Sequence, residues 1–327
     1  AYRRVMALAP GWGRYFVPLN RGKRSVTLDL KREQDRARSA ALVATADVVL
    51  HNFPLERAEA FGLGWEELHA RRPALVVGHV TAYGEDGPLA GERAYDLVAQ
   101  GHAGLLTAHA SPGDRVPVRA GGIPIADLTA GHLLAAGVLA ALVRARSTGE
   151  GERVAVSLLA AALAVQAQDL VWLEGEGGDG TGARPATRHD LARRADEIAL
   201  GLELNPYYRC YEAADGFLAV ACLNTPQRAA FLGLLGLADD TVETPDLVPA
   251  SASARERKRT LTATIERAVA AEPVAAWLAR LGAAGVPCGP VHVRETVGAD
   301  EQVRAAGLVG AIEQPGLGTV RLLGPVV

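Results

Sequence analysis

The chain has 327 residues, of which 49% are hydrophobic and 22% are charged, as in ordinary soluble globular proteins. A chain of this length can bury a large core and forms two domains more often than one. Its formal net charge of -3 gives no sign of the strongly basic surface that binds nucleic acids or anionic membranes.

Candidate strands and helices alternate through the first half of the chain. Short β-branched runs predict strands, and longer charged or apolar stretches predict helices. In chain order we expect a strand at residues 25–30, a helix at 31–46, a strand at 46–50, a helix near 65–69, a strand at 74–80, a core helix at 128–143, and a strand at 154–158 followed by a helix through Trp172. This order predicts a Rossmann-like α/β domain with a parallel sheet. Ligands of such sheets bind beyond the carboxyl ends of the strands, which directs attention to the loops after Leu50 and Val80.

The second half has a different character. From residue 174 the composition shifts to glycine, threonine, arginine and acidic residues, which is typical of a linker. A hairpin at 207–221 follows, then helices at 227–235 and 254–281, the second broken near Pro273. We therefore predict a large α/β domain at residues 1–173, a linker at 174–197, a smaller α+β domain at 198–288, and a return to the large domain at 289–327.

Asp127 is the strongest candidate for a catalytic residue. It directly precedes the apolar run Leu128–Val143. At the predicted N-cap of this helix, backbone N–H groups and the helix dipole favour an ionised carboxylate, which can act as a nucleophile. Position alone, however, is more typical of an aspartate that only caps a helix.

Other patterns limit the partners of the chain. The run after Asp127 is shorter than the ~20 residues needed to cross a bilayer, and it contains His132, so we expect a core helix and no membrane partner. Cys210, Cys222 and Cys288 are widely spaced and have no neighbouring metal ligands. They predict reduced thiols in the cytoplasm, with no disulfide framework and no metal site. No Gly-x-Gly-x-x-Gly follows a predicted strand, which argues against a dinucleotide dehydrogenase.

Several segments match a known pattern in order and spacing across nearly the whole chain. They are Asn20–Leu30, Thr81–Pro88, Tyr95–Gln100, Ile125–Gly131, Thr148–Gly151 and Gln314–Gly318. Each segment is weak alone, but together they are specific. In this set the chain resembles the class III CoA-transferases of the CaiB/BaiF type, relatives of formyl-CoA transferase and of the α-methylacyl-CoA racemases.

The resemblance implies a chemistry for Asp127. In this family an aspartate at the matching position attacks the thioester of the donor acyl-CoA and forms a mixed anhydride. The released CoA thiolate then converts the anhydride to an aspartyl-CoA thioester, from which the acceptor acid takes CoA. Such covalent catalysis divides one difficult exchange into easier steps. The family context therefore favours a nucleophile over a simple helix cap.

Tyr95 discriminates between activities within the resemblance. The racemases have a histidine at this position, and a tyrosine with its high pKa is a poor base for exchanging an α-proton. Tyr95 therefore favours a CoA-transferase. Two alternatives remain open: an acyl-CoA racemase or isomerase of the same family, and a non-catalytic acyl-CoA-binding subunit of a heteromeric transferase.

Further site residues and partners are implied by the resemblance. The substrates would be an acyl-CoA and a free carboxylic acid, with no permanently bound cofactor, and the chain would form an interlaced homodimer. Matching positions imply CoA contacts from Leu28, Asp29, Leu30, Lys31, Asn52, Phe53, Arg93 and Tyr95.

The sequence also departs from the family pattern. An additional strand and helix that normally precede residue 20 are not in the sequence. The usual Arg-Pro-Gly does not follow Phe53, and Ala60 replaces a common arginine, for which Arg57 is a candidate substitute. The glycine-rich loop of formyl-CoA transferase is replaced by residues 199–206. We therefore expect an acyl group larger than formyl or oxalyl, with Glu203 or Asn205 near it. Trp172 and Trp277 are expected to pack at domain or subunit surfaces.

Overall fold

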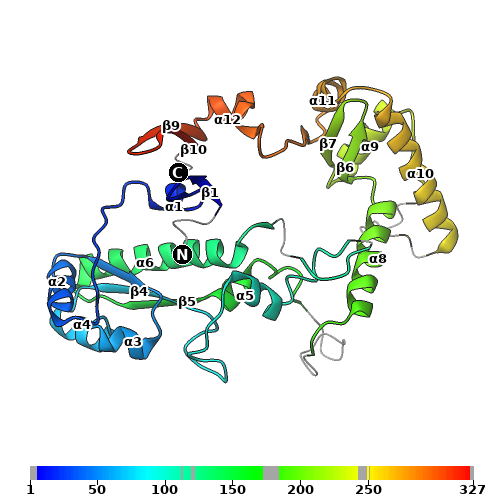
Figure 1. The fold of residues 1–327 in the computed structure, drawn as a ribbon. Coiled ribbons are helices and arrows are strands. Elements are labelled where there is room, and N and C mark those ends of the chain that lie inside the picture. Colours follow the sequence, from blue (N-terminus) through cyan, green and yellow to red (C-terminus); the bar gives the residue numbers. More distant parts are fainter. Residues whose placement is uncertain are drawn as a thin grey trace. The chain divides into compact units, whose positions relative to one another are not determined.

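The computed structural model of the chain describes residues 6–111, 113–118, 122–171, 184–241, 249 and 251–324. It divides the chain into two compact units (Figure 1). One unit comprises residues 27–200, and the other combines residues 1–26 with 201–327. The domain boundaries given above remain predictions.

A three-stranded parallel sheet forms the centre of the unit at residues 27–200. Its strands are β3 (Val48–His51), β4 (Val76–Thr81) and β5 (Arg153–Ser157), in the order β3-β4-β5. Val77 lies opposite Val49 on one side and Arg153 on the other. Both faces of β4 are buried, which is why its sequence is a continuous apolar run rather than an alternating one. The predicted mixed α/β fold with a parallel sheet is confirmed.

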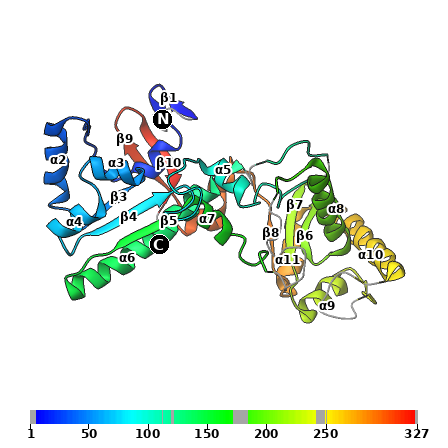
Figure 2. The ribbon, with the colours of Figure 1, turned by 90° about the horizontal axis from the view of Figure 1, so that it is seen from below.

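Helices cover both faces of this sheet. Leu68 of α4 packs with Val77 on one face, and Leu134 and Val138 of α6 pack with Val76 on the other. Up to residue 164, the helices of this unit are α2 (Glu33–Val43), α3 (Leu55–Ala60), α4 (Trp65–Arg71), α5 (Asp96–His102), α6 (Ile125–Thr148) and α7 (Leu158–Ala164). Figure 2 shows α6 running beside β4 and β5.

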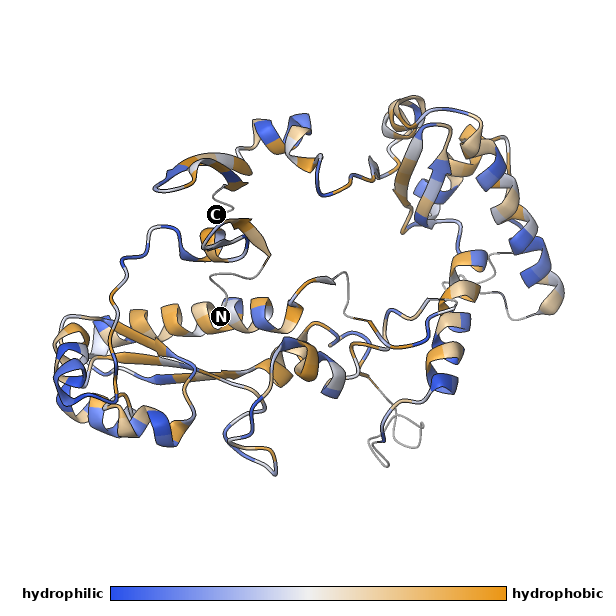
Figure 3. Cartoon of the chain, in the orientation of Figure 1, coloured by the Kyte–Doolittle hydropathy of each residue, from blue (hydrophilic) through white to orange (hydrophobic). Residues whose placement is uncertain are grey.

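Helix α6 is buried along one stripe. The buried residues recur every three or four positions and are Ala126, Ala130, Leu134, Val138, Ala141 and Ala145. By length and composition alone α6 could also cross a membrane, a test that core helices of soluble proteins pass as well. Figure 3 shows it as a largely hydrophobic helix. Its packing on the sheet is that of the core helix which the sequence predicts.

Residues 25–30 do not form the predicted strand. They run as irregular chain into the turn before α2, and Val26 is 63% exposed. Their β-branched residues suit a strand, but a strand needs a neighbour to hydrogen-bond with. Within the described part of the chain, these residues pair with no other strand.

The second unit contains the predicted hairpin. Strands β6 (Tyr208–Ala213) and β7 (Gly216–Ala221) pair antiparallel, and β8 (Cys288–Pro290) adds to the other side of β7. Three helices pack with this sheet: α9 (Thr225–Leu234), α10 (Ala252–Ala270) and α11 (Val274–Ala283). The break between α10 and α11 comes before Pro273, as predicted.

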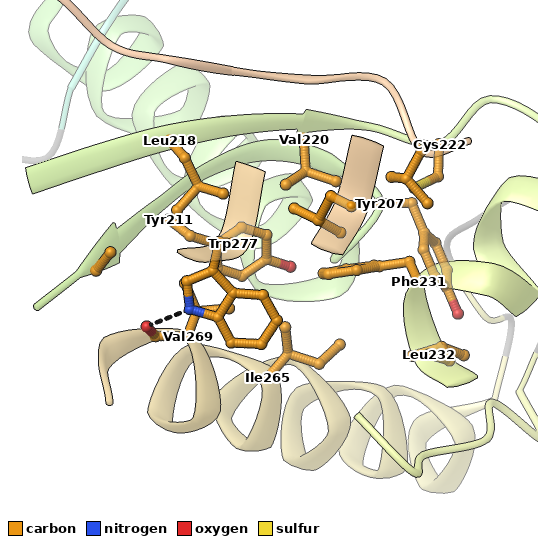
Figure 4. Close-up of a cluster of buried hydrophobic side chains, with 13 residues drawn as sticks. Tyr207, Tyr211, Leu218, Val220, Cys222, Phe231, Leu232, Ile265, Val269 and Trp277 are labelled. Carbon is orange, nitrogen blue, oxygen red and sulfur yellow. Dashed lines mark hydrogen bonds between the residues drawn. The ribbon is translucent and has the colours of Figure 1, made fainter. Parts of the chain in front are cut away.

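Trp277 lies in the core of this unit (Figure 4). Its side chain packs with Tyr211, Phe231 and Ile265, and its indole Nε1 donates a hydrogen bond of 2.9 Å to the carbonyl of Val269. The expectation of a surface position was therefore wrong, because the apolar face of α11 directs Trp277 inward. Trp172 lies outside the described residues.

The remaining elements lie near the two ends of the chain and between the domains predicted from the sequence. Arg21 donates to the carbonyl of Leu323 at 2.6 Å. Helix α8 begins at Arg188, within the predicted linker, and ends at Leu204, beyond it. The terminal elements are β1 (Ala7–Ala9), β2 (Trp12–Gly13), α1 (Phe16–Asn20), η3 (Val297–Ala299), α12 (Glu301–Ala305), β9 (Val309–Gln314) and β10 (Gly318–Leu323).

Candidate active site

Asp127 lies at the carboxyl edge of the parallel sheet. Helix α6 connects β4 to β5 and runs against the direction of the strands. Its first buried residues, Ala126 and Ala130, pack with Val80 and Val156 near the ends of those strands. The half-buried Asp127 is therefore placed at the edge where ligands of parallel α/β sheets bind.

Asp127 is not the N-cap of its helix, contrary to the prediction. Helix α6 begins at Ile125, after Pro124, so Asp127 lies in the first turn. The reason is local: the fixed φ of Pro124 suits a helix start, and the helix begins before the apolar run from which its start was predicted. The carboxylate remains near the positive end of the helix dipole, which favours its charged form.

Asp96 caps this helix from another element. It is the first residue of α5, and its Oδ1 accepts hydrogen bonds from the backbone N–H groups of Ala126 at 2.9 Å and Asp127 at 3.3 Å. The N–H of Ile125 bonds to the carbonyl of Ile123. With the N–H of Leu128 donating to the carbonyl of Pro124, the first-turn amides are all engaged. The helix therefore acts on a nearby anion through its dipole rather than through open N–H groups.

Tyr95 is brought next to the Asp127 segment. It is the N-cap residue of α5 and directly precedes Asp96, whose side chain bonds to the backbone of Asp127. Tyr95 is 80% exposed, so its ring is accessible to a ligand. Arg93 is also exposed, in the loop before α5. Two of the predicted site residues, Tyr95 and Asp127, thus come from neighbouring helix N-termini.

Asn52 and Phe53 follow β3 at the same edge of the sheet. The carbonyl of Phe53 lies 2.9 Å from Nε2 of the buried His79, and because a carbonyl only accepts, Nε2 carries a proton. Nδ1 of His79 lies 3.0 Å from Glu85, which also binds Arg153 at 2.7 Å. The backbone of the predicted CoA-contact segment is therefore anchored from the centre of the sheet.

A cavity of about 280 Å³ lies on the α3–α4 face of the sheet, lined in part by His51, Trp65, His79 and Arg153. Burial, and then the electrostatic influence of the nearby His79 and Arg153, lower the pKa of His51 to about 4. The His51 ring is therefore neutral at pH 7. This face is opposite to the one covered by α6.

The segment at residues 28–31 forms the turn before α2. Oδ1 of Asp29 accepts from the N–H of Lys31 at 3.2 Å. Arg36 donates to the carbonyls of Leu30 and Lys31 at 3.2 and 3.0 Å. Leu28 is half-buried, whereas the Lys31 side chain is exposed. The ammonium of Lys31 is thus accessible to a phosphate, as a nucleotide-binding role requires.

Glu203 and Asn205 belong to the other unit and have structural partners there. Glu203 pairs with Arg259 at 3.0 Å, and the side chain of Asn205 accepts from the N–H of Tyr207 at 3.0 Å. Their expected contact with the substrate stays a prediction. In the described part of the chain, no three His, Cys, Asp or Glu side chains gather as a metal site.

Comparison with known proteins identifies the family of this site. The model of CoA-transferase family III matches residues 1–327. The chain belongs to CoA-transferase family III. It is therefore an enzyme of the class that the resemblance implied.

Named relatives agree with this assignment. The chain is 32% identical over 308 residues to the probable fatty acyl-CoA transferase Rv3272 of Mycobacterium tuberculosis, covering 91% of this chain and 74% of the relative. It is 31% identical over 303 residues to the succinate–glutarate CoA-transferase of Agrobacterium fabrum, covering 90% and 69%.

Solved structures share the fold. A crystal structure of an aspartate-to-alanine mutant of Rv3272 aligns with a TM-score of 0.73 and 28% identity, over 99% of this chain and 80% of that one. A CaiB/BaiF family protein from Brucella suis aligns with a TM-score of 0.70 and 28% identity, over 97% and 77%.

The structure adds site residues that the sequence did not single out. Asp96 caps α6, and His79 with Glu85 and Arg153 anchors the Phe53 segment. Asp96 is part of the Tyr95–Gln100 motif, so its position in that motif was the available signal. His79 lies inside an apolar strand, where a histidine is most often a core residue.

Proposed function

We propose that this family III CoA-transferase moves CoA from an acyl-CoA to a free carboxylic acid through a covalent intermediate on Asp127. The single observation that carries the proposal is the place of Asp127 in the first turn of α6, at the carboxyl edge of the sheet. The helix dipole there favours the ionised carboxylate that the chemistry needs. Tyr95 next to this turn further supports transfer over racemisation.

The transfer of CoA proceeds in four steps. A carboxylate oxygen of Asp127 attacks the thioester carbon, and the C–S bond breaks to release CoA thiolate. The thiolate attacks the Asp127 carbonyl of the anhydride, which frees the donor acid and leaves an aspartyl-CoA thioester. The acceptor carboxylate attacks this thioester and again releases the thiolate. Attack of the thiolate on the acceptor carbonyl gives the new acyl-CoA and restores Asp127.

We propose that CoA lies along the edge defined by the predicted contact residues. Asn52 and Phe53 follow β3, and Tyr95 precedes α5, at the edge that carries Asp127. Lys31 and Arg93 are exposed cations that suit the phosphates of CoA. CoA would be supplied by the substrate itself rather than by a permanently bound cofactor.

The proposal includes a cytoplasmic homodimer. Cys210, Cys222 and Cys288 are free thiols, which suits a reducing compartment. The face of α6 opposite the sheet exposes Leu139 and Val143, and a second copy of the chain is the partner proposed to cover it.

Mass spectrometry of the intact protein tests the nucleophile. After mixing with succinyl-CoA, oxalyl-CoA or octanoyl-CoA, we expect a CoA-sized adduct that peptide mapping places on Asp127. Asp127→Ala should lose the adduct and at least about 1,000-fold in transfer rate, because the covalent route is closed. Asp114→Ala, at a half-buried aspartate in a loop of the same unit, is the matched control. A full adduct yield in folded Asp127→Ala would refute the assignment.

A further inference from the structure

Asp96 is buried among hydrogen-bond donors. Its residue is 5% exposed, and its Oδ2 accepts from Nε2 of Gln100 at 2.7 Å. Its Oδ1 accepts the two backbone N–H groups of α6, from Ala126 at 2.9 Å and from Asp127 at 3.3 Å. These donors are neutral, so the carboxylate is held by N–H groups and by the positive end of the helix rather than by a cationic side chain.

This arrangement joins α5 to the start of α6. The first N–H groups of a helix have no partner inside the helix, and Pro124 offers no side-chain cap. Asp96 supplies the acceptor from a different element and so fixes how the first turn is oriented. One of the two amides that it holds belongs to Asp127 itself.

We propose that Asp96 is a positioning residue for the reaction. It acts through the backbone of the first turn of α6 and sets where the Asp127 carboxylate meets the thioester carbon. The inference rests on the proposed role of Asp127 as nucleophile. Reacting atoms must approach to about 3–3.5 Å, and a displacement of about 1 Å can cost about 100-fold in rate. Because Asp96 is buried, its removal should slow the chemistry and leave CoA binding unchanged.

The test measures the two quantities separately. Rapid-quench mass spectrometry gives the rate of adduct formation with succinyl-CoA and octanoyl-CoA, and calorimetry gives the Kd of free CoA. In Asp96→Ala we expect adduct formation to slow by about 10–100-fold with an unchanged Kd. A folded Asp96→Ala that reacts at the wild-type rate overturns the proposal.

Asp96→Asn provides the rescue. It keeps an acceptor oxygen for the α6 amides, and the Gln100 side chain, whose Oε1 has no partner among the described residues, can turn to accept from the new amide. We expect a rate within about threefold of wild type, since the hydrogen bonds to the helix are retained. A rate as low as that of Asp96→Ala overturns the proposal, because the charge and not the acceptor would then be required.

Gln166→Leu is the matched structural control. Gln166 is 8% exposed, and its Nε2 donates to the carbonyls of Ala103 and Ala162, so the variant removes buried hydrogen bonds in the same unit without touching Asp96 or α6. A merely structural role predicts that Asp96→Ala and Gln166→Leu both lose activity in proportion to stability, whereas positioning predicts a normal rate in Gln166→Leu. If Asp96→Ala does not fold, Asp96→Ser serves instead, and a wild-type rate in it overturns the proposal.

Labelling of the wild type and of Asp127→Ala distinguishes a failure of this inference from a failure of the proposed function. Wild-type labelling that is lost in Asp127→Ala establishes the nucleophile, whatever the Asp96 variants do. Labelling that persists in Asp127→Ala removes the nucleophile assignment, and the positioning role falls with it. Normal labelling in Asp96→Ala removes the positioning role alone.

Discussion

Lys258 is completely buried, with its ammonium against the carboxylate of Asp239. The same carboxylate accepts from the hydroxyl of Tyr207 at 2.5 Å and from the N–H of Thr241 at 2.9 Å. Burial raises the pKa of Asp239, but the bonds from Lys258, Thr241 and Tyr207 outweigh it and hold that pKa below its ordinary value. Burial, followed by the hydrogen bond to Asp239, raises the pKa of Tyr207. The cluster ties α10 to the start of β6.

Removing one member of this pair should be costly. Lys258→Met leaves a buried carboxylate without its cation, and we expect a loss of about 3–5 kcal/mol in the free energy of unfolding. Urea denaturation followed by circular dichroism measures the loss. The control is Arg257→Ala, since Arg257 pairs with Asp240 at 3.4 Å in an exposed position. We expect a change of less than about 1 kcal/mol there. Equal losses in the two variants would contradict the idea that burial decides the cost.

Among single residues, the sequence indicates some members of the candidate site and not others. Asp127 could be singled out because a motif surrounds it, although the resemblance rather than the position made it a nucleophile. Its neighbour across space, Asp96, was missed because capping between two helices depends on tertiary contact and not on sequence spacing. The partner of Lys258 lies 19 positions away, which no local pattern indicates.

At the scale of elements, the turn between α6 and β5 depends on two different glycines. Gly149 ends α6 with a φ of 79° and has open space around its Cα. The φ of Gly151 is not in the left-handed region, but a Cβ there would lie 2.0 Å from the carbonyl oxygen of Leu75. One glycine is required by backbone conformation and the other by the close approach of the chain that enters β4.

The two glycines should respond differently to alanine. Gly149→Ala places a side chain in the left-handed region, which costs about 1–2 kcal/mol. Gly151→Ala must push two backbone segments apart, and we expect about 3 kcal/mol, at the upper end of overpacking costs. Thermal unfolding of both variants measures the difference. The reverse order of stability would mean that the turn relaxes around the added methyl group.

Apolar runs made several elements predictable, and two short helices were missed. The strands β3, β4 and β5 and the helix α6 were predictable because each coincides with a run of apolar residues. Such a run must be buried against a neighbouring element. Helices α3 and α5 have 6 and 7 residues, too few to display a helical period. Helix α8 was missed because its first half lies in the stretch whose composition predicts a linker; Leu191 and Ala195 form a small buried cluster with Ala110.

At the scale of the whole molecule, one face of α6 carries exposed apolar residues. Leu139 is 61% exposed and Val143 is 70% exposed, and with Leu128 they lie on one side of the helix, away from the sheet. The unit at residues 27–200 by itself leaves this apolar stripe uncovered, which supports the proposed homodimer.

Light scattering after size exclusion tests the dimer. We expect the wild type to have twice the 34.2 kDa mass of one chain. Leu139→Glu should shift the protein towards monomer, because it places a charge in an apolar interface. Leu42→Glu, at an exposed position of α2, should leave the mass unchanged. A measured wild-type mass equal to that of one chain would contradict the proposed homodimer.

The hydrogen bond from Arg21 to the carbonyl of Leu323 joins positions 302 residues apart. The entropy lost in closing a loop grows with the logarithm of its length, and contacts of such separation form late when a chain folds. The sheet at residues 27–200 and the core around Trp277 close far shorter loops. During refolding, the two ends of the chain are therefore expected to meet after both cores have formed, which makes their pairing the slowest part of the structure to acquire.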